Sequence, residues 1–301
     1  MFYNGHRALQ YPRILGHEIS GIIVESRAAG FHFGERVQIA PGITCNECRY
    51  CRGGASNMCQ KISIIGFNRN GGYAEYIAIP PEGISSQIVN LIPEQLSFQE
   101  AALAEPLACC INGQELTGVG YGDTVLIFGA GPIGCLHAML ARVNGAEKVL
   151  VADTLTSRIE SAGSTEADRL IDLSRESIEQ AVFEETKGKG VDVILLAASE
   201  AAAAYPLLEM LAPRGRVNIF SGLPHEKSFL KLDANLIHYK ELTITGSYGC
   251  TAEQNKKALK IMASGEVRTD WLITSKVTLD GIEKGIENVK KRKGLKTIIE
   301  F

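Results

Sequence analysis

Residues 122–153, GDTVLIFGAGPIGCLHAMLARVNGAEKVLVAD, give the clearest indication of fold class in this 301-residue chain. The stretch opens on a short apolar run, 124–128, with Gly122 and Gly129 close to its two ends. A β-branched run of this length indicates a buried parallel strand rather than a helix. A helical pattern follows over 132–144, and a second apolar run, 148–152, ends at Asp153. Strand, helix and strand in this order predict a βαβ unit of a parallel sheet.

Gly129, Gly131 and Gly134 stand in G-x-G-x-x-G spacing between the predicted strand and helix. The first glycine allows a tight turn, the second lets backbone approach a pyrophosphate, and the third lets the helix pack against the strand. The helix N-terminus then offers N–H groups and a partial positive charge to the phosphates. Pro132 suits the first helical turn, since its missing N–H would have no partner there. The flanking elements favour a dinucleotide site over an ordinary glycine-rich turn.

An acid at the end of the second strand bears on which dinucleotide binds. Asp153 is placed to accept hydrogen bonds from an adenosine ribose, and its charge would repel a 2′-phosphate, which favours NAD over NADP. A helix N-cap is the alternative role for this aspartate. Arg158 could instead accommodate a 2′-phosphate. The candidate cofactor-binding residues here are Gly129, Ala130, Gly131, Pro132, Ile133, Gly134, Asp153 and Arg158.

Composition excludes several classes of protein. The chain is 45% hydrophobic and 22% charged with a net charge of −3, which is typical of a globular protein without a nucleic-acid-binding surface. No apolar run approaches the roughly eighteen residues of a membrane helix, and the N-terminus has no hydrophobic signal core. We therefore expect a cytoplasmic protein with neither a nucleic-acid nor a membrane partner.

Four of the eight cysteines lie close together, in CNECRYCRGGASNMC. Cys45, Cys48, Cys51 and Cys59 have C-x2-C-x2-C-x7-C spacing, which lets four thiolates close a tetrahedral structural zinc site. An iron–sulfur cluster is the alternative, but in ferredoxin runs a proline follows the fourth cysteine, and here Gln60 follows. A redox-sensing thiol cluster would require these cysteines to be free of metal. The clustering favours metal over disulfides.

Five motifs follow one another along the chain: LGHE (15–18), the four-cysteine lobe, GGYAEY (71–76), AEPLA (104–108) and GAGPIG (129–134). As a set they resemble the zinc-containing medium-chain alcohol/polyol dehydrogenases, most closely the sorbitol (L-iditol) dehydrogenase branch. The resemblance runs from about Pro12 to the end of the chain. It implies a catalytic zinc bound by His17 and Glu18, with Glu105 as a further ligand or as a carboxylate next to the zinc-bound water. It also implies that Ser221 and Gly222 line the nicotinamide pocket.

The same resemblance implies the architecture and the reaction. The fold class is α/β, with a Rossmann doubly wound parallel sheet over 113–252 and a mostly-β GroES-like catalytic domain over 1–112 and 253–301. Hydride would pass between NAD and a secondary alcohol, a sugar alcohol, whose oxygen is polarised by zinc. The family also implies a homo-oligomer, either a dimer or a tetramer.

The chain departs from the family pattern in two places. The family's first catalytic zinc ligand is a cysteine upstream of GHE, and this chain begins after that motif. We therefore expect an incomplete catalytic site, about one zinc per chain rather than two, and sorbitol oxidation near background. A truncated, non-catalytic protein that binds NAD and zinc is the alternative function. Cys109 and Cys110 are no obvious replacement, since they look like plain buried thiols. The second departure is Ala-Ala-Ser-Glu at 197–200, where the family usually has a glycine.

Four further patterns predict local structure. GGYAEYIAIP predicts a turn and then an alternating strand over 73–80. Ser97 and Glu100 have capping-box spacing at the start of a helix that runs to about Cys110, with a kink at Pro106. A helix is expected over 202–211. The lysine-rich run 290–296 is expected to be a solvated surface.

Overall fold

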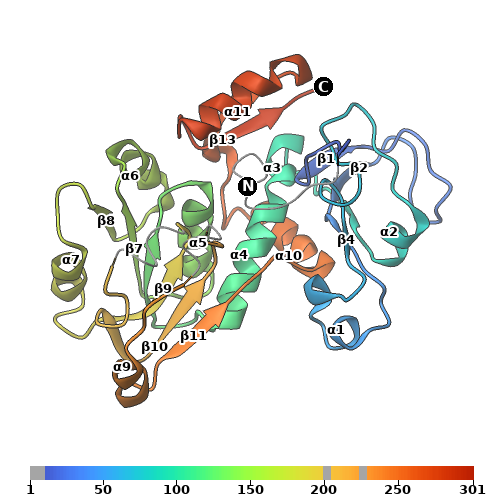
Figure 1. Ribbon diagram of the computed structural model, residues 1–301. Coiled ribbons are helices and arrows are strands. Elements are labelled where there is room, and N and C mark those ends of the chain that lie inside the picture. Colours follow the sequence, from blue (N-terminus) through green and yellow to red (C-terminus); the bar gives the residue numbers. More distant parts are fainter. Residues whose placement is uncertain (1–10, 199–204, 224–228) are drawn as a thin grey trace. The chain divides into compact units, whose positions relative to one another are not determined.

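The computed structural model describes residues 11–198, 205–223 and 229–301 (Figure 1). The chain forms two compact units. The first joins Met1–Ile111 to Gly249–Phe301, and the second is the continuous segment Asn112–Tyr248.

A six-stranded parallel sheet is the centre of the second unit. Its strand order is β11-β10-β9-β6-β7-β8. This is the 6-5-4-1-2-3 order of a doubly wound Rossmann sheet, so the predicted fold class is confirmed for this part of the chain. The strands are β6 (Thr124–Phe128), β7 (Lys148–Asp153), β8 (Arg169–Asp172), β9 (Val191–Leu196), β10 (Leu211–Ile219) and β11 (Thr243–Gly246).

The central strands are buried on both faces. Residues 125–127 of β6 and 149–152 of β7 are 0% exposed. Helices cover both faces of a doubly wound sheet, so its inner strands are continuously apolar instead of alternating. The helical segments of this unit are α5 (Pro132–Val143), α6 (Thr156–Ala162), η3 (Gly163–Thr165), α7 (Ile178–Glu185) and α9 (Ala234–Tyr239).

The first unit is built from small sheets. β1 (Ile19–Ile22), β2 (Arg36–Ile39) and β5 (Val89–Leu91) form an antiparallel sheet, β3 (Gly42–Ile43) pairs with β4 (Ser63–Ile64), and β12 (Ile273–Val277) pairs in parallel with β13 (Lys296–Ile299). Val37, Ile39 and Ile88 belong to its buried core, against which Ala252 packs. Its other segments are α1 (Arg49–Arg52), η2 (Ser56–Met58), α2 (Pro81–Ser85), α3 (Phe98–Ala102), α10 (Ala252–Ala263), η5 (Asp270–Leu272), η6 (Leu279–Gly281) and α11 (Ile282–Lys290).

The predicted helix over 97–110 is interrupted. The capping box at its start is confirmed, because the side chains of Ser97 and Glu100 each accept a hydrogen bond from the other's backbone N–H. α3 nevertheless ends at Ala102 with Leu103 as its C-cap, and a separate helix, α4 (Ala104–Thr117), follows. Pro106 has no N–H to donate to the carbonyl four residues earlier, so the chain breaks before the proline instead of kinking at it.

Two other expectations were wrong in detail. No strand forms over 73–80, which is described throughout as turn and irregular chain. The helix expected over 202–211 does not occur in its described part, because 205–210 form turns and Leu211 already belongs to β10. Residues 202–204 lie outside the described residues. Alternating or apolar patterns of this length do not specify a strand or a helix unless neighbouring elements supply the packing.

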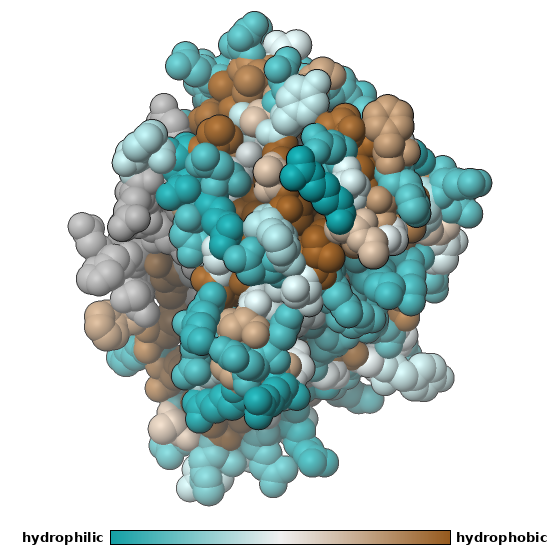
Figure 2. Space-filling view, turned by 90° about the vertical axis from the view of Figure 1, so that its right-hand side faces the viewer, coloured by the Kyte–Doolittle hydropathy of each residue, from teal (hydrophilic) through white to brown (hydrophobic). Residues whose placement is uncertain are grey.

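The surface drawn in Figure 2 is mostly polar, with apolar residues exposed between the hydrophilic ones. In the first unit the exposed apolar side chains include Ile22, Phe33 and Leu91. Within the described ranges, no helix is both long enough and apolar enough to cross a bilayer.

Candidate functional site

The glycine-rich turn between β6 and α5 has a conformation that its glycines require. Gly129 has φ +105°, a backbone region that side chains disfavour, and its N–H donates to the Ala152 carbonyl at 2.7 Å. A Cβ on Gly134 would lie 1.6 Å from the Gly129 carbonyl oxygen. Pro132 is the first residue of α5, and Ile133 follows it. Among the described residues, no side chain caps this helix. Its first N–H groups therefore remain available, as an anion site at a helix N-terminus requires.

Asp153 closes the turn from the neighbouring strand. Its Oδ2 accepts the Ala130 N–H at 2.8 Å and its Oδ1 accepts the Leu155 N–H at 2.9 Å. The N-cap of α6 is Leu155, so the alternative role of Asp153 as a helix cap is not realised. The Arg158 guanidinium lies over the same turn, with Nη1 3.1 Å from the position of a Cβ on Gly131. The structure therefore brings the aspartate and the arginine to one glycine turn.

Ser221 and Gly222 follow β10 at the same carboxyl edge of the sheet. Ser221 donates its N–H to Leu196 at 3.1 Å and its hydroxyl to Ala197 at 3.0 Å, both at the end of β9. A Cβ on Gly222 would meet no atom within 4 Å. Ala198 packs on the glycine turn, because its own Cβ lies 3.1 Å from the position of a Cβ on Gly129. Of the departure at 197–200, the last two residues lie outside the described part.

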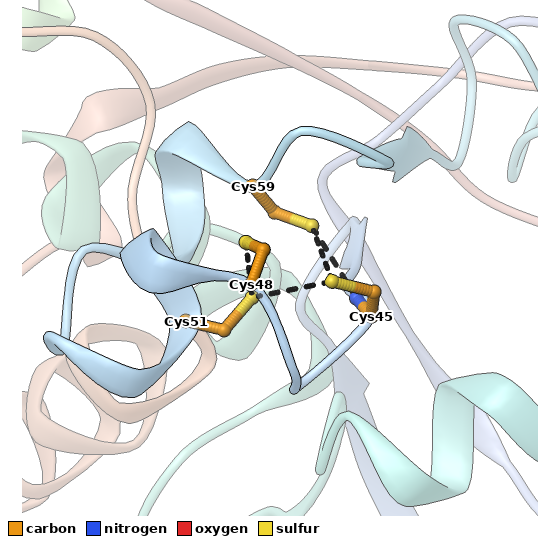
Figure 3. Close-up of side chains that lie close together, drawn as sticks. All are labelled: Cys45, Cys48, Cys51 and Cys59. Atoms are coloured by element: carbon orange, nitrogen blue, oxygen red, sulfur yellow. Dashed lines mark hydrogen bonds between the residues drawn. The ribbon is translucent and has the colours of Figure 1, made fainter.

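The four cysteines of the lobe converge in the first unit (Figure 3). Cys48 precedes α1 as its N-cap, and Cys59 follows η2. The sulfur atoms of Cys45 and Cys59 are 3.5 Å apart, those of Cys48 and Cys51 are 3.5 Å apart, and those of Cys45 and Cys51 are 3.9 Å apart. Zinc–sulfur bonds of about 2.3 Å in a tetrahedron place the sulfurs about 3.8 Å apart. The donor set therefore fits one tetrahedral ion.

Backbone donors favour the thiolate form at two of these four cysteines, Cys45 and Cys48. The Cys51 N–H donates to Cys48 and, with the Gln60 N–H, lowers the pKa of the Cys48 thiol to about 6. Backbone donors from Glu47 and Cys48 also lower the pKa of Cys45. Thiolate is the form of cysteine that binds metal.

A second cluster of possible metal ligands contains His17, Glu18 and Glu105. One ligand atom from each residue lies within 4.8 Å of the others. His17 and Glu18 come directly before β1, and Glu105 is in the first turn of α4. The shortest contact between His17 and Glu105 is 3.9 Å, from Nε2 to Oε2. Two carboxylates and one imidazole can hold zinc and leave a fourth position open.

Lys296 joins this cluster from β13, and the sequence did not indicate it. Its Nζ donates to Glu18 Oε2 across 278 residues of chain. Burial acts to raise the pKa of Glu18, but the Lys296 and His17 charges together with the Lys296 hydrogen bond outweigh it, and the result is a lowered pKa. Burial raises the pKa of Glu105, which is only 6% exposed. The expectation of a solvated surface was therefore wrong for Lys296, which is the last residue of the lysine-rich run.

We expect Lys296→Met to lower the free energy of unfolding by about 1–3 kcal/mol near neutral pH in chelator-treated protein, because it leaves the part-buried Glu18 carboxylate without its cation. Because its pKa is lowered, Glu18 stabilises the fold at pH values above its unfolded-state pKa of about 4.3. This stabilisation is lost as the pH falls through the folded-state pKa. Urea unfolding at about pH 7 and about pH 3.5 should therefore show a smaller difference between variant and wild type in acid.

Lys276 on the adjacent strand provides the matched control for that variant. Its Nζ is 2.8 Å from Glu300 Oε1, and both side chains are well exposed. An exposed pair contributes only about 0–1 kcal/mol, so Lys276→Met should have little effect at either pH. Equal losses of unfolding free energy in Lys296→Met and Lys276→Met would contradict a stabilising role of the Lys296–Glu18 ion pair.

Two further sulfurs lie next to Glu105. Cys109, one helical turn along α4, donates to Glu105 Oε1 at 3.5 Å, and the Cys250 sulfur lies 3.9 Å from the same oxygen. The interpretation of Cys109 as a plain buried thiol therefore missed its contact with Glu105. No sequence motif indicates that Cys250 lies near Glu105, because 145 residues separate the two.

Comparison with known proteins agrees with this geometry. Residues 1–89 match the family model of the alcohol dehydrogenase GroES-like domain, and 132–264 match that of zinc-binding dehydrogenases. D-xylulose reductase A of Aspergillus oryzae is 31% identical over 98% of this chain and 82% of its own length. L-galactonate-5-dehydrogenase of Escherichia coli K12 is 31% identical over 97% of this chain and 84% of its own.

A solved structure from Sinorhizobium meliloti, described as a zinc-binding dehydrogenase bound to NADP, has a TM-score of 0.90. It is 30% identical and covers 98% of this chain and 86% of its own. The GroES-like model lies within the first unit, and the zinc-binding dehydrogenase model covers most of the second unit and extends to residue 264 of the first. The chain therefore belongs to the zinc-containing medium-chain alcohol/polyol dehydrogenase family.

Proposed function

We propose that this chain is a zinc-dependent oxidoreductase that transfers hydride between NAD and the secondary alcohol of a sugar alcohol. The observation that carries the proposal is the cluster of His17, Glu18 and Glu105, whose ligand atoms lie within 4.8 Å of one another. The unit Met1–Ile111 with Gly249–Phe301 would carry the alcohol site, and Asn112–Tyr248 the dinucleotide site. D-xylulose and L-galactonate, which appear in the names of relatives, supply the substrate class.

The three side chains would hold the catalytic ion from two segments, the residues directly before β1 and the first turn of α4. His17 offers a neutral nitrogen, and Glu18 offers a carboxylate that Lys296 keeps ionised and oriented. Glu105 is buried in the first turn of α4, where the helix dipole favours a negative charge. Zinc bound there would supply Lewis acidity to the alcohol oxygen and lower its pKa. Cys45, Cys48, Cys51 and Cys59 would hold a second, purely structural zinc, since all four positions are thiolates.

The dinucleotide would lie at the carboxyl edge of the Rossmann sheet. The close approach of Gly134 to Gly129 leaves the N-terminus of α5 open to a pyrophosphate, as phosphate sites at helix N-termini require. Asp153 would bind the adenosine ribose, and Ser221 and Gly222 would face the nicotinamide. Bound NAD supplies the hydride acceptor. The similar S. meliloti structure contains NADP, so the choice of cofactor in this chain depends on Asp153 and Arg158.

We expect NAD to bind at least about tenfold tighter than NADP, because a charge-assisted hydrogen bond together with the repelled phosphate is worth about 1.4 kcal/mol or more. Asp153→Asn should reduce that ratio toward one in a fluorescence titration with both nucleotides. Asp172 ends the next strand and accepts the Ser174 N–H at 3.0 Å in the same local geometry, so Asp172→Asn is the matched control. Equal affinities in the wild type would reject this role of Asp153 and favour Arg158 as a phosphate ligand.

The proposed reaction is tested directly with zinc-loaded protein. NADH oxidation with D-xylulose and NAD reduction with L-galactonate and xylitol are followed by absorbance. His17→Ala should reduce turnover by about a hundredfold or more while NAD affinity stays unchanged, because the ion loses its position in the alcohol site. His32 is exposed on a loop, and His32→Ala should leave turnover intact. Turnover that is unaffected by His17→Ala would reject the proposed centre.

We further infer a homo-oligomer, as the family resemblance implies, which light scattering on the purified chain would test. A cytoplasmic location is the companion inference. Its support is that all eight cysteines are free thiols, which is the state that a reducing compartment maintains.

A further inference from the structure

The Glu105 carboxylate faces different chemistry on its two oxygens. Oε2 lies toward His17, at 3.9 Å from Nε2, while Oε1 lies toward the sulfurs of Cys109 and Cys250. The proposed catalytic centre uses the nitrogen and oxygen donors of His17 and Glu18. The thiol side of Glu105 takes no part in that centre.

The thiol side brings together three possible ligands, and two of them are thiols, whose thiolates soft and borderline divalent ions prefer. One ligand atom each from Glu105, Cys109 and Cys250 lies within 4.8 Å of the others. Zinc bonds of about 2.0–2.3 Å place tetrahedral ligands about 3.3–3.8 Å apart, so only a small contraction is needed. Glu105 and Cys109 are four residues apart in α4, so their side chains lie on one face of the helix.

Cys250 is held in place by a buried amide network. Asn255 Nδ2 donates to the Cys250 sulfur at 3.2 Å, and Asn255 Oδ1 accepts from Gln38 Nε2 at 3.1 Å. Gln38 Oε1 in turn accepts from Asn90 Nδ2 at 3.0 Å. Outer contacts of this kind orient metal ligands. Both Cys109 and Cys250 are half-buried.

We propose that Glu105, Cys109 and Cys250 form a second metal subsite, which binds zinc, cobalt or cadmium in preference to magnesium or calcium. Two thiolates and one carboxylate match soft and borderline ions, whereas hard ions require oxygen ligands. Binding displaces the two thiol protons to solvent, and no electron is transferred. The subsite is distinct from the proposed catalytic centre, with which it shares only the Glu105 carboxylate.

Cobalt distinguishes the two positions, because only thiolate ligands give a strong near-ultraviolet charge-transfer absorption. The full chain is first treated with a chelator mild enough to retain the four-cysteine zinc, whose content is checked by elemental analysis. Cobalt is then titrated in. We expect this absorption in the wild type, with at least about half of it lost in Cys109→Ser and in Cys250→Ser, since each variant removes one of two thiolates.

Two variants serve as controls. Cys110 is the next residue of α4 and is fully buried, but it is not one of the three clustered ligands, so Cys110→Ser should keep the absorption. The double variant His17→Ala, Glu18→Gln removes the nitrogen and oxygen set and should also keep it. Thermal unfolding of every variant establishes that it is folded.

The outcomes separate this subsite from the proposed function. Cobalt binding without charge-transfer absorption, or absorption unchanged by both cysteine variants, would overturn the subsite. Turnover of a polyol with no such absorption would likewise reject the subsite alone and leave the catalytic proposal standing. Absorption that depends on Cys109 and Cys250, in a protein that transfers no hydride, would support the subsite and reject the proposed function.

Discussion

Gly134→Ala is expected to reduce NAD affinity by at least about a hundredfold, or about 2.7 kcal/mol, and to destabilise the nucleotide-binding unit. The added methyl would lie 1.6 Å from the Gly129 carbonyl oxygen, and that oxygen belongs to backbone that cannot rotate away. Either α5 moves off β6 or the turn opens, and both displace the N–H groups that would face the pyrophosphate. Overpacking of this kind costs typically about 1–3 kcal/mol and more where backbone must shift.

Gly163→Ala is the matched control in the same unit. A Cβ at Gly163 meets no atom within 4 Å, and its φ is −53°, a helical value that alanine adopts freely. Gly134→Ala should therefore lower both the melting temperature and the NADH affinity measured by fluorescence titration, whereas Gly163→Ala should change neither. If Gly134→Ala bound NAD as tightly as the wild type, the turn would not be the phosphate site.

Cys48→Ser is expected to remove one zinc per chain and to unfold the cysteine lobe. Structural zinc contributes an apparent free energy of about 10–16 kcal/mol in isolated zinc-finger peptides, and binding is coupled to folding. The lobe has little else to hold it, because its only helical segments are α1 with four residues and η2 with three. Limited proteolysis should cut near α1 in the variant and spare it in the wild type.

The nucleotide-binding unit should be unaffected by that loss, because its core contains none of the four cysteines. Cys135 lies in α5 and is 0% exposed, so Cys135→Ser controls for the cost of replacing a buried sulfur without touching the lobe. It should retain the zinc that Cys48→Ser loses. Full zinc content and an unchanged melting temperature in Cys48→Ser would show that the lobe holds no metal.

Features that depend on short spacings could be predicted from the amino-acid sequence. The apolar runs and the glycines of 122–153 specify strand, turn and helix through neighbouring residues, and β6, α5 and β7 form where they were expected. The capping box of Ser97 and Glu100 is local in the same way, since each member meets the other within one helical turn. The cysteine spacing likewise brings four sulfurs together within a single lobe.

The surroundings of Glu105 and Glu18 could not be predicted in this way, because they depend on long-range packing. Lys296 reaches Glu18 from β13 across 278 residues, and Cys250 reaches Glu105 across 145. No periodicity encodes such contacts, because they depend on how helix α4, the strands of the first unit and the chain before α10 pack against one another. A buried carboxylate is expensive without partners, so Glu105 in AEPLA signalled that partners exist. The identity of these partners follows only from the packing, which brings residues distant in sequence to one carboxylate.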